Sequence, residues 1–243
     1  MKLLAFDTST DALSIAVSST RDGPARQWQH SGPGGAQASS TLIPAIQSLL
    51  TQAGLRFEEL DAVVFGRGPG SFTGLRTACA VAQGLAFGAG VKVLPVDTLL
   101  AVAEEARQQL ADATPAQPPN STLHVTALLD ARMDEMYMAS YAYSHGRWVQ
   151  HADHALIKPA ALVSQAESLL AGNVFTVYGE RLPAWTTAAT RLQVLPTATA
   201  LLRLAPALLA EGRAVSADQA LPLYIRDKVA KTTLERAAEK AGA

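Results

Sequence analysis

The first half of the chain alternates short apolar runs with longer segments of helical periodicity. Apolar runs bounded by turn residues predict strands at 2–8, 13–18, 25–30, 62–65 and 91–96. Apolar residues recurring every three or four positions predict helices at 39–53, 71–88 and 97–110. Because strands that alternate with helices are typical of a layered α/β domain, we expect that fold class.

The second half has a similar pattern after a Pro-rich segment. Strands are predicted at 123–129, 136–143 and 174–178, and helices at 159–171 and 198–211. The segment 112–121 has the composition of a linker. We therefore expect one lobe at 1–111 and another at 122–243, with a frayed tail from 226 onward and C-terminal helices able to pack back on the first lobe.

Composition excludes several classes of protein. The 243 residues carry 20 Lys+Arg and 21 Asp+Glu, and a net charge of −1 argues against a large nucleic-acid footprint, although a local patch stays open. Cys79 is the single cysteine, which excludes an internal disulfide framework. Asp7 interrupts any signal-peptide core, and no apolar run approaches the roughly 18 residues of a membrane span. We expect a cytoplasmic protein with no membrane contact.

A weak internal repeat links the two halves. Residues 6–11 fall on residues 129–134 when the chain is shifted by 123 positions. Each copy is a buried strand that ends in Asp, followed by a tight turn and an alternating strand. Identities are few, but duplication of one α/β unit explains the pattern better than coincidence.

The turn after the first strand could cradle a phosphate. Backbone N–H groups and hydroxyls would contact the anion, with a hydrated Mg²⁺ on the aspartate; the candidate residues are Asp7, Thr8, Ser9 and Thr10. The alternative is a polar turn that satisfies its own backbone. In the second copy Arg132 and Met133 replace the small residues that close phosphate approach needs. The paired cradle therefore looks degraded, and any nucleotide site would be vestigial.

The loop GRGPGSFTGLR, residues 66–76, follows a strand and opens a helix. It fits neither a P-loop nor Gly-x-Gly-x-x-Gly. Two interpretations stay open: a sharp strand-to-helix turn capped by Ser71, or an interaction role. The helix after it carries two rows of small residues, Gly74, Ala78, Ala82 and Ala86, and Ala80, Gly84 and Gly88. We expect one row to face a second helix, either 39–53 or that of a partner.

The histidines give no metal site, because none are spaced as His-x-x-x-His. Cys79 lies within the small-residue helix and is interpreted as packing. Ser71 is not in a Gly-x-Ser-x-Gly elbow, so a serine hydrolase is unsupported. No catalytic residue, metal or cofactor is expected.

Four segments together resemble the TsaB (YeaZ) family. They are LLAFDTSTDALSIAV near the start, GRGPGSFTGLR, LLDARMDEMY in the second half and the late PLYIR. The resemblance implies a duplicated actin-like (ASKHA, ribonuclease-H-like) fold. It also implies a non-catalytic subunit of the bacterial machinery that installs N6-threonylcarbamoyladenosine in tRNA. Its partners would be the catalytic subunit TsaD and the ATPase TsaE, with tRNA reached through the complex. Alone, the protein would form a homodimer.

In that family the N-terminal helices bind TsaD. The resemblance therefore implies a partner-binding surface on the two helices of the first lobe, and the candidates are Ser39, Leu42, Ile43, Ile46, Leu49, Arg76, Ala80, Val81 and Gly84. One alternative is an autonomous ATP-dependent enzyme, a small kinase or ATPase, that uses Asp7 and residues 8–10. Another is direct tRNA binding through Arg67, Arg76 and residues 228–231.

Overall fold

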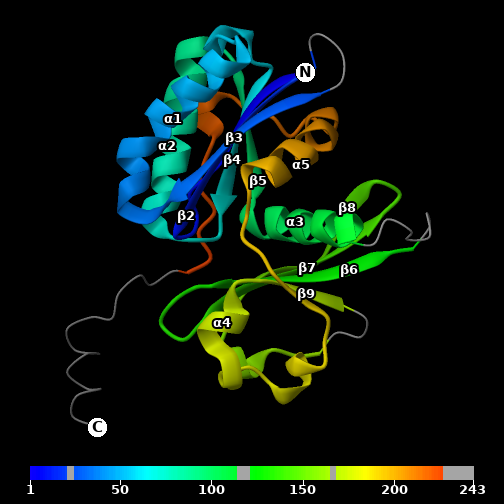
Figure 1. The fold of residues 1–243 in the computed structure, drawn as a ribbon. Helices are drawn as coiled ribbons and strands as arrows, with labels where there is room; N and C mark the ends of the chain where they lie inside the picture. The colour runs from blue at the N-terminus through cyan, green and yellow to red at the C-terminus, as the bar shows by residue number, and fades with distance from the viewer. Residues whose placement is uncertain (21–24, 114–120, 165–167, 227–243) are drawn as a thin grey trace, which may run out of the picture.

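The computed structural model describes residues 1–20, 25–113, 121–164 and 168–226, and its core is two five-stranded sheets (Figure 1). The first sheet has the order β3-β2-β1-β4-β5. The first three strands are antiparallel, and β4 and β5 run parallel to β1. Their bounds are β1 Lys2–Asp7, β2 Ala12–Ser19, β3 Arg26–Pro33, β4 Ala62–Gly68 and β5 Lys92–Asp97.

The second sheet repeats the topology of the first. Its order is β10-β9-β6-β7-β8, with β7 and β8 antiparallel and β9 and β10 in the parallel half. Its bounds are β6 Leu123–Asp130, β7 Met136–Ser144, β8 Arg147–Ile157, β9 Ser168–Gly172 and β10 Arg191–Gln193. Since β1 ends at Asp7 and β6 ends at Asp130, the shift of 123 residues relates equivalent strand ends. The prediction of a duplicated α/β fold is confirmed.

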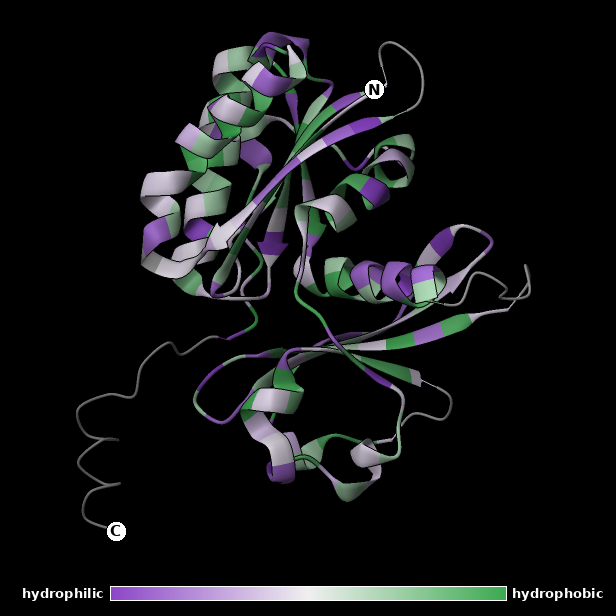
Figure 2. Ribbon diagram, viewed as in Figure 1, coloured by the Kyte–Doolittle hydropathy of each residue, from purple (hydrophilic) through white to green (hydrophobic). Residues whose placement is uncertain are grey.

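Two helices cover one face of the first sheet (Figure 1). They are α1, Ala38–Ala53, and α2, Phe72–Ala89. Each ends at a glycine in the left-handed region, Gly54 and Gly90, where a side chain would be strained. Apolar side chains from both helices and from β1, β2 and β4 form a continuous core beneath them. By contrast the edge strand β3 is mostly exposed and hydrophilic (Figure 2).

The other face of the first sheet is covered by helices from both halves of the chain. The first, α3, spans Thr98–Ala113 and packs mainly on the second sheet, while α5, Ala198–Ala210, packs on the first. Figure 1 shows α3 between the two sheets and α5 beside the first sheet, and the two helices contact each other. One apolar core therefore runs through both sheets and both helices. The two halves of the chain are therefore held together by apolar packing of α5 and α3. The expected linker, 112–121, lies mostly in 114–120, outside the described residues.

Two predictions for the second lobe are wrong. The segment 159–171, expected to be a helix, contains a short 3-10 turn, Pro159–Ala161, and the strand β9. The segment 174–178, expected to be a strand, is the helix α4, Val174–Tyr178. Its two end residues lie one helical turn apart and are both buried in the core outside the second sheet, so packing overrides their β propensity.

Candidate functional site

The turn that follows β1 is buried, and its hydroxyls form hydrogen bonds within the protein. Asp7, Thr8 and Ser9 are 1%, 0% and 2% exposed. The backbone N–H and the hydroxyl of Ser9 both donate to Asp7 Oδ1, at 2.8 and 2.6 Å. The Thr8 hydroxyl donates to the Gly74 carbonyl at 2.7 Å. Thr10, at the edge of the turn, bonds the backbone of Ala12. The hydroxyls expected to hold a phosphate are therefore engaged inside the protein.

The glycines of the GRGPGSFTG loop pack directly on this turn. A Cβ on Gly66 would lie 1.7 Å from Asp7 Oδ2, and one on Gly74 would lie 1.8 Å from the Thr8 carbonyl oxygen. A Cβ on Gly70 would lie 2.6 Å from the Ser9 carbonyl oxygen. These three glycines, four residues apart, each contact a different residue of the same turn. The structure favours the strand-to-helix interpretation of the loop.

Ser71 occupies the N-cap position of α2, although its side chain makes no capping bond. Its backbone N–H donates instead to the Ser9 carbonyl oxygen at 2.8 Å. The helix therefore begins against the turn, and the orphan N–H expected at a helix start is used to hold the turn in place.

Asp7 is a buried carboxyl group with one unpaired oxygen. Its Oδ2 has no hydrogen-bond partner among the described residues, and it lies against the backbone of Gly66. Burial raises the pKa of Asp7 from 3.8 to about 6, against the hydrogen bonds from Ser9 and the hydroxyl of Thr98, which lower it. Asp7 is 1% exposed and its Oδ2 lies against Gly66, which disfavours the hydrated Mg²⁺ considered for this turn.

We expect Asp7→Asn to stabilise the protein above pH 7 and to change little near pH 4. A folded-state pKa raised from 3.8 to about 6 means that stability falls as pH rises through this window, by about 3 kcal/mol in total. Asparagine keeps the acceptor for Ser9 and has no charge to bury. The check is urea unfolding of both proteins between pH 4 and 8. A stability difference that does not vary with pH would contradict the assignment.

The second turn repeats one hydrogen bond of the first but is engaged differently. The backbone N–H of Arg132 donates to Asp130 Oδ1 at 2.8 Å, as Ser9 does to Asp7. The same oxygen accepts from the Tyr178 hydroxyl at 2.5 Å. Residues 132–134 all have positive φ, between 52° and 62°, without a glycine among them. The aspartate of this turn is therefore bonded by a tyrosine side chain from α4, which has no counterpart in the first turn.

Both turns line one cleft between the lobes, with a volume of about 300 Å³. Across it Arg132 Nη2 and Asp11 Oδ1 form an ion pair at 3.0 Å. The start of α2 forms another wall, through Ser71 and Phe72. The two turns thus face the same cleft. Arg132 of the second turn is paired with Asp11, beside the first.

The late PLYIR motif belongs to an extended strap, residues 213–226, that runs over α2. Val215 pairs with Val93 of β5, and the Leu223 N–H donates to the Arg67 carbonyl at 2.7 Å. The Tyr224 ring stacks on Phe72, with centroids 4.8 Å apart. At its end Arg226 Nη2 contacts Glu135 Oε2 at 2.5 Å. The strap therefore connects the glycine loop of the first lobe to the turn of the second.

The residues predicted to bind a partner divide into two groups. Leu42, Ile46 and Leu49 are 0%, 0% and 4% exposed and lie in the core beneath α1 and α2. They cannot contact a partner in this fold, which corrects the expectation for these three side chains. The others reach the surface, fully or in part; they are Ser39, Ile43, Arg76, Ala80, Val81 and Gly84.

The structure adds one residue to this surface. Phe87 on α2 is 84% exposed, the largest value among the exposed large apolar side chains of the described residues. It follows Arg76, Ala80 and Gly84 at helical steps, a signal that was present in the sequence. We call the exposed group Ser39, Ile43, Arg76, Ala80, Val81, Gly84 and Phe87 the α1–α2 face.

Other groups give weaker signals. In the part of the chain that the structure describes, no cluster of three or more His, Cys, Asp or Glu side chains could hold a metal ion. Nor is any helix there long and apolar enough to cross a membrane. Arg67, a candidate for tRNA contact, is paired with Asp97 at 2.5 Å. Residues 228–231 lie outside the described residues.

Comparisons with known proteins agree with the motifs. The family model "TsaD: tRNA N6-adenosine threonylcarbamoyltransferase" matches residues 33–234. The tRNA threonylcarbamoyladenosine biosynthesis protein TsaB of Escherichia coli (strain K12) is 33% identical over 239 residues, which cover 95% of this chain and 96% of that protein. The TsaB of Haemophilus influenzae is 30% identical over 94% of this chain and 95% of its own length.

A solved structure shares the fold. YeaZ from Pseudomonas aeruginosa aligns with a TM-score of 0.78 and 35% identity, over 92% of this chain and 99% of that one. Identity of this level over nearly the whole length of each relative shows that the proteins are homologous. The shared fold includes the duplicated α/β architecture. The chain belongs to the TsaB (YeaZ) family of tRNA threonylcarbamoyladenosine biosynthesis proteins.

Proposed function

We propose that this protein is a non-catalytic subunit that binds TsaD and activates it in tRNA N6-threonylcarbamoyladenosine synthesis. TsaE would be the ATPase of the same complex, and tRNA would be reached through the complex in the cytoplasm. In the absence of TsaD, the same surface would form a homodimer. The observation that carries the proposal is the exposed α1–α2 face.

The chemistry of this face suits the close approach of another helix. Nothing lies within 4 Å of the position where Gly84 would carry a Cβ, and the same holds for Gly88. Small residues let helix backbones approach closely, while Ile43 and Phe87 offer apolar area at 42% and 84% exposure. Arg76 adds a positive charge. Its Nε donates to the Tyr224 hydroxyl oxygen at 3.2 Å, which orients the guanidinium group.

We expect Gly84→Glu and Ile43→Glu each to weaken TsaD binding by at least about tenfold, because each places a charge in an apolar contact. Both positions are exposed, so the isolated protein should keep its fold. Affinity is measured by pull-down and calorimetry with the TsaD of the same organism. Val163→Glu is the matched control, since Val163 is 77% exposed but lies in the second lobe. Wild-type affinity in both α1–α2 variants would reject this surface.

A modification assay tests the role itself. Product formation with TsaD, TsaE, threonylcarbamoyl-adenylate and tRNA should depend on this chain. Equal product in its absence would remove the activating role. Binding to TsaD that persists without any effect on product would leave a scaffold that does not activate.

The rival function, an autonomous ATP-dependent enzyme, needs groups that the turns do not offer. The hydroxyls of Thr8 and Ser9 are engaged, and Arg132 is paired with Asp11. Calorimetry with ATP and Mg²⁺ separates the two functions. Micromolar binding that is lost in Asp7→Ala would favour the enzyme.

A further inference from the structure

A second cavity lies between the lobes and shares no lining residue with the cleft of the paired turns. Its volume is about 370 Å³, which is in the range of small-molecule sites. The walls come from α3, α5, β7 and β8, so both halves of the chain contribute. Nothing in the proposed role on the α1–α2 face uses it.

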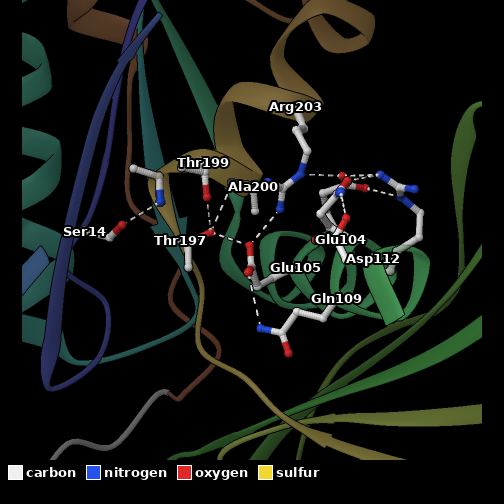
Figure 3. Close-up of polar contacts among 12 residues, drawn as sticks. Ser14, Glu104, Glu105, Gln109, Asp112, Thr197, Thr199, Ala200 and Arg203 are labelled. Carbon is white, nitrogen blue, oxygen red and sulfur yellow. Dashed lines mark hydrogen bonds and ion pairs between the residues drawn. The ribbon is translucent and has the colours of Figure 1, made fainter. Parts of the chain in front are cut away.

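A buried carboxylate organises one wall of this cavity. Glu104 is 3% exposed, and its Oε1 accepts from Arg107 Nη2 at 2.8 Å and from Arg203 Nε at 2.9 Å. Its Oε2 accepts from Arg107 Nε at 2.8 Å and from Trp148 Nε1 at 3.0 Å. Figure 3 shows Arg203 of α5 reaching Glu104 and Glu105 on α3. Glu104 is therefore saturated, and it fixes two guanidinium groups.

The two fixed guanidinium groups keep donors for a ligand. Arg107 also bonds Gln108 through Nη2, and Arg203 bonds Glu105 through Nη2. Neither Nη1 group forms a hydrogen bond or ion pair with the described residues, and both side chains are about a fifth to a quarter exposed where they line the cavity. An arginine already held in position loses little entropy when it binds an anion.

The rest of the cavity combines apolar surface with further positive charge. Leu204 and Leu208 of α5 line it, together with Tyr143 and Trp148, whose ring centroids are 5.0 Å apart. The Arg107 guanidinium lies over the Tyr143 ring, 4.7 Å from its centroid. The rim carries three exposed charged residues that form no ion pair among the described residues, namely Arg147, Arg213 and Glu211. The unpaired charge at the rim is therefore net positive.

We propose that this cavity binds a small organic anion with an aromatic or apolar body. A carboxylate or phosphate would accept from Arg107 and Arg203, and the body would pack between the leucines of α5 and the ring of Trp148. The long-range field of Arg147 and Arg213 would favour entry of an anion. The cavity is separate from the α1–α2 face, so a test of anion binding here does not depend on whether the protein binds TsaD.

The test uses Trp148 as a reporter. Trp28→Phe with Trp185→Phe leaves it as the single tryptophan. Phenyl phosphate and 3-phenylpropionate are titrated in separate arms, which distinguish a phosphate from a carboxylate ligand, and benzyl alcohol is the uncharged probe. We expect saturable fluorescence change with at least one anion at millimolar concentration or below, and a weaker response at high salt. No saturation by either anion, or equal affinity for benzyl alcohol, overturns the proposal.

A matched pair of variants tests the charge requirement. Ala207 of α5 lines the cavity and is exposed, so a longer side chain there leaves the fold intact. Ala207→Glu places a carboxylate at the mouth, and Ala207→Gln places a neutral group of the same size. We expect the Glu variant to bind the anion at least about fivefold more weakly than the Gln variant. Equal affinities of the two variants would show that the cavity does not select anions.

Discussion

Replacing Gly74 by alanine is expected to destabilise the protein by more than about 3 kcal/mol. The new Cβ would lie 1.8 Å from the carbonyl oxygen of Thr8. That atom belongs to the backbone of the buried turn, so no side-chain rotation relieves the contact, and the cost should exceed that of ordinary overpacking. Separating the two segments would also break the bond from the Thr8 hydroxyl to the Gly74 carbonyl. The measurement is the free energy of unfolding in urea.

Gly84→Ala is the matched control on the same helix. Gly84 is exposed, and open space surrounds its Cβ position. Alanine should therefore stabilise the isolated protein by up to about 1 kcal/mol through helix propensity alone. Similar stabilities of the Gly74→Ala and Gly84→Ala variants would show that the close contact with the Thr8 carbonyl does not require glycine at position 74. Because Gly84 also lies on the α1–α2 face, the same variant should bind TsaD no better than the wild type despite its higher stability.

Much of the architecture could be predicted from the sequence because local pattern and global topology agree. Asp7 and Asp130 mark equivalent strand ends, and the shift of 123 residues places β1, β2 and β3 on β6, β7 and β8; β9 and β10 take the places of β4 and β5 at shorter shifts. The first helix ends at Gly54, as the predicted range 39–53 implies, whereas the second, predicted at 71–88, continues through Gly88 and ends at Gly90. These features depend on short-range chemistry that a single sequence carries.

The errors come from segments whose structure depends on distant neighbours. Leu169, Leu170 and Ala171 are all buried because β9 pairs with β6 in the parallel half of a covered sheet. Such a strand has no alternation, so its periodicity does not separate it from a buried helix. The packing of α5 on the first sheet, by contrast, agrees with the expectation that C-terminal helices can pack back on the first lobe.

The candidate surface was only partly predictable for a related reason. Leu42, Ile46 and Leu49 recur at helical spacing, and such a stripe marks the face that packs in the protein's own core. The residues between them, such as Ile43, are the ones that reach the surface. Periodicity alone separates the two faces of the helix but does not show which residues on the other face contact a partner. The role of the three glycines in the loop likewise required the position of the Asp7 turn.

We expect Glu104→Ala to destabilise the protein by about 3–5 kcal/mol, the cost of removing one member of a buried ion cluster. Burial opposes ionisation of Glu104, but hydrogen bonds from Arg107 and Trp148 outweigh it and lower its pKa. Its loss would leave Arg107 without a counterion and remove the contact between α3 and Arg203 Nε. Thermal and urea unfolding measure the effect. Glu58→Ala, at an exposed position, should change stability by less than about 0.5 kcal/mol.

A compensated variant separates an orphaned charge from lost packing. If the destabilisation arises from unpaired guanidinium groups, adding Arg107→Leu and Arg203→Met to Glu104→Leu should recover most of the loss, because apolar residues of similar volume can replace a buried cluster. Glu105→Gln is included, since Glu105 would otherwise lose its ion pair with Arg203. The recovered protein should keep its fold yet lose the fluorescence response of Trp148 to organic anions. Recovery that leaves this response unchanged would mean that Arg107 and Arg203 hold the lobes together without serving the cavity between them.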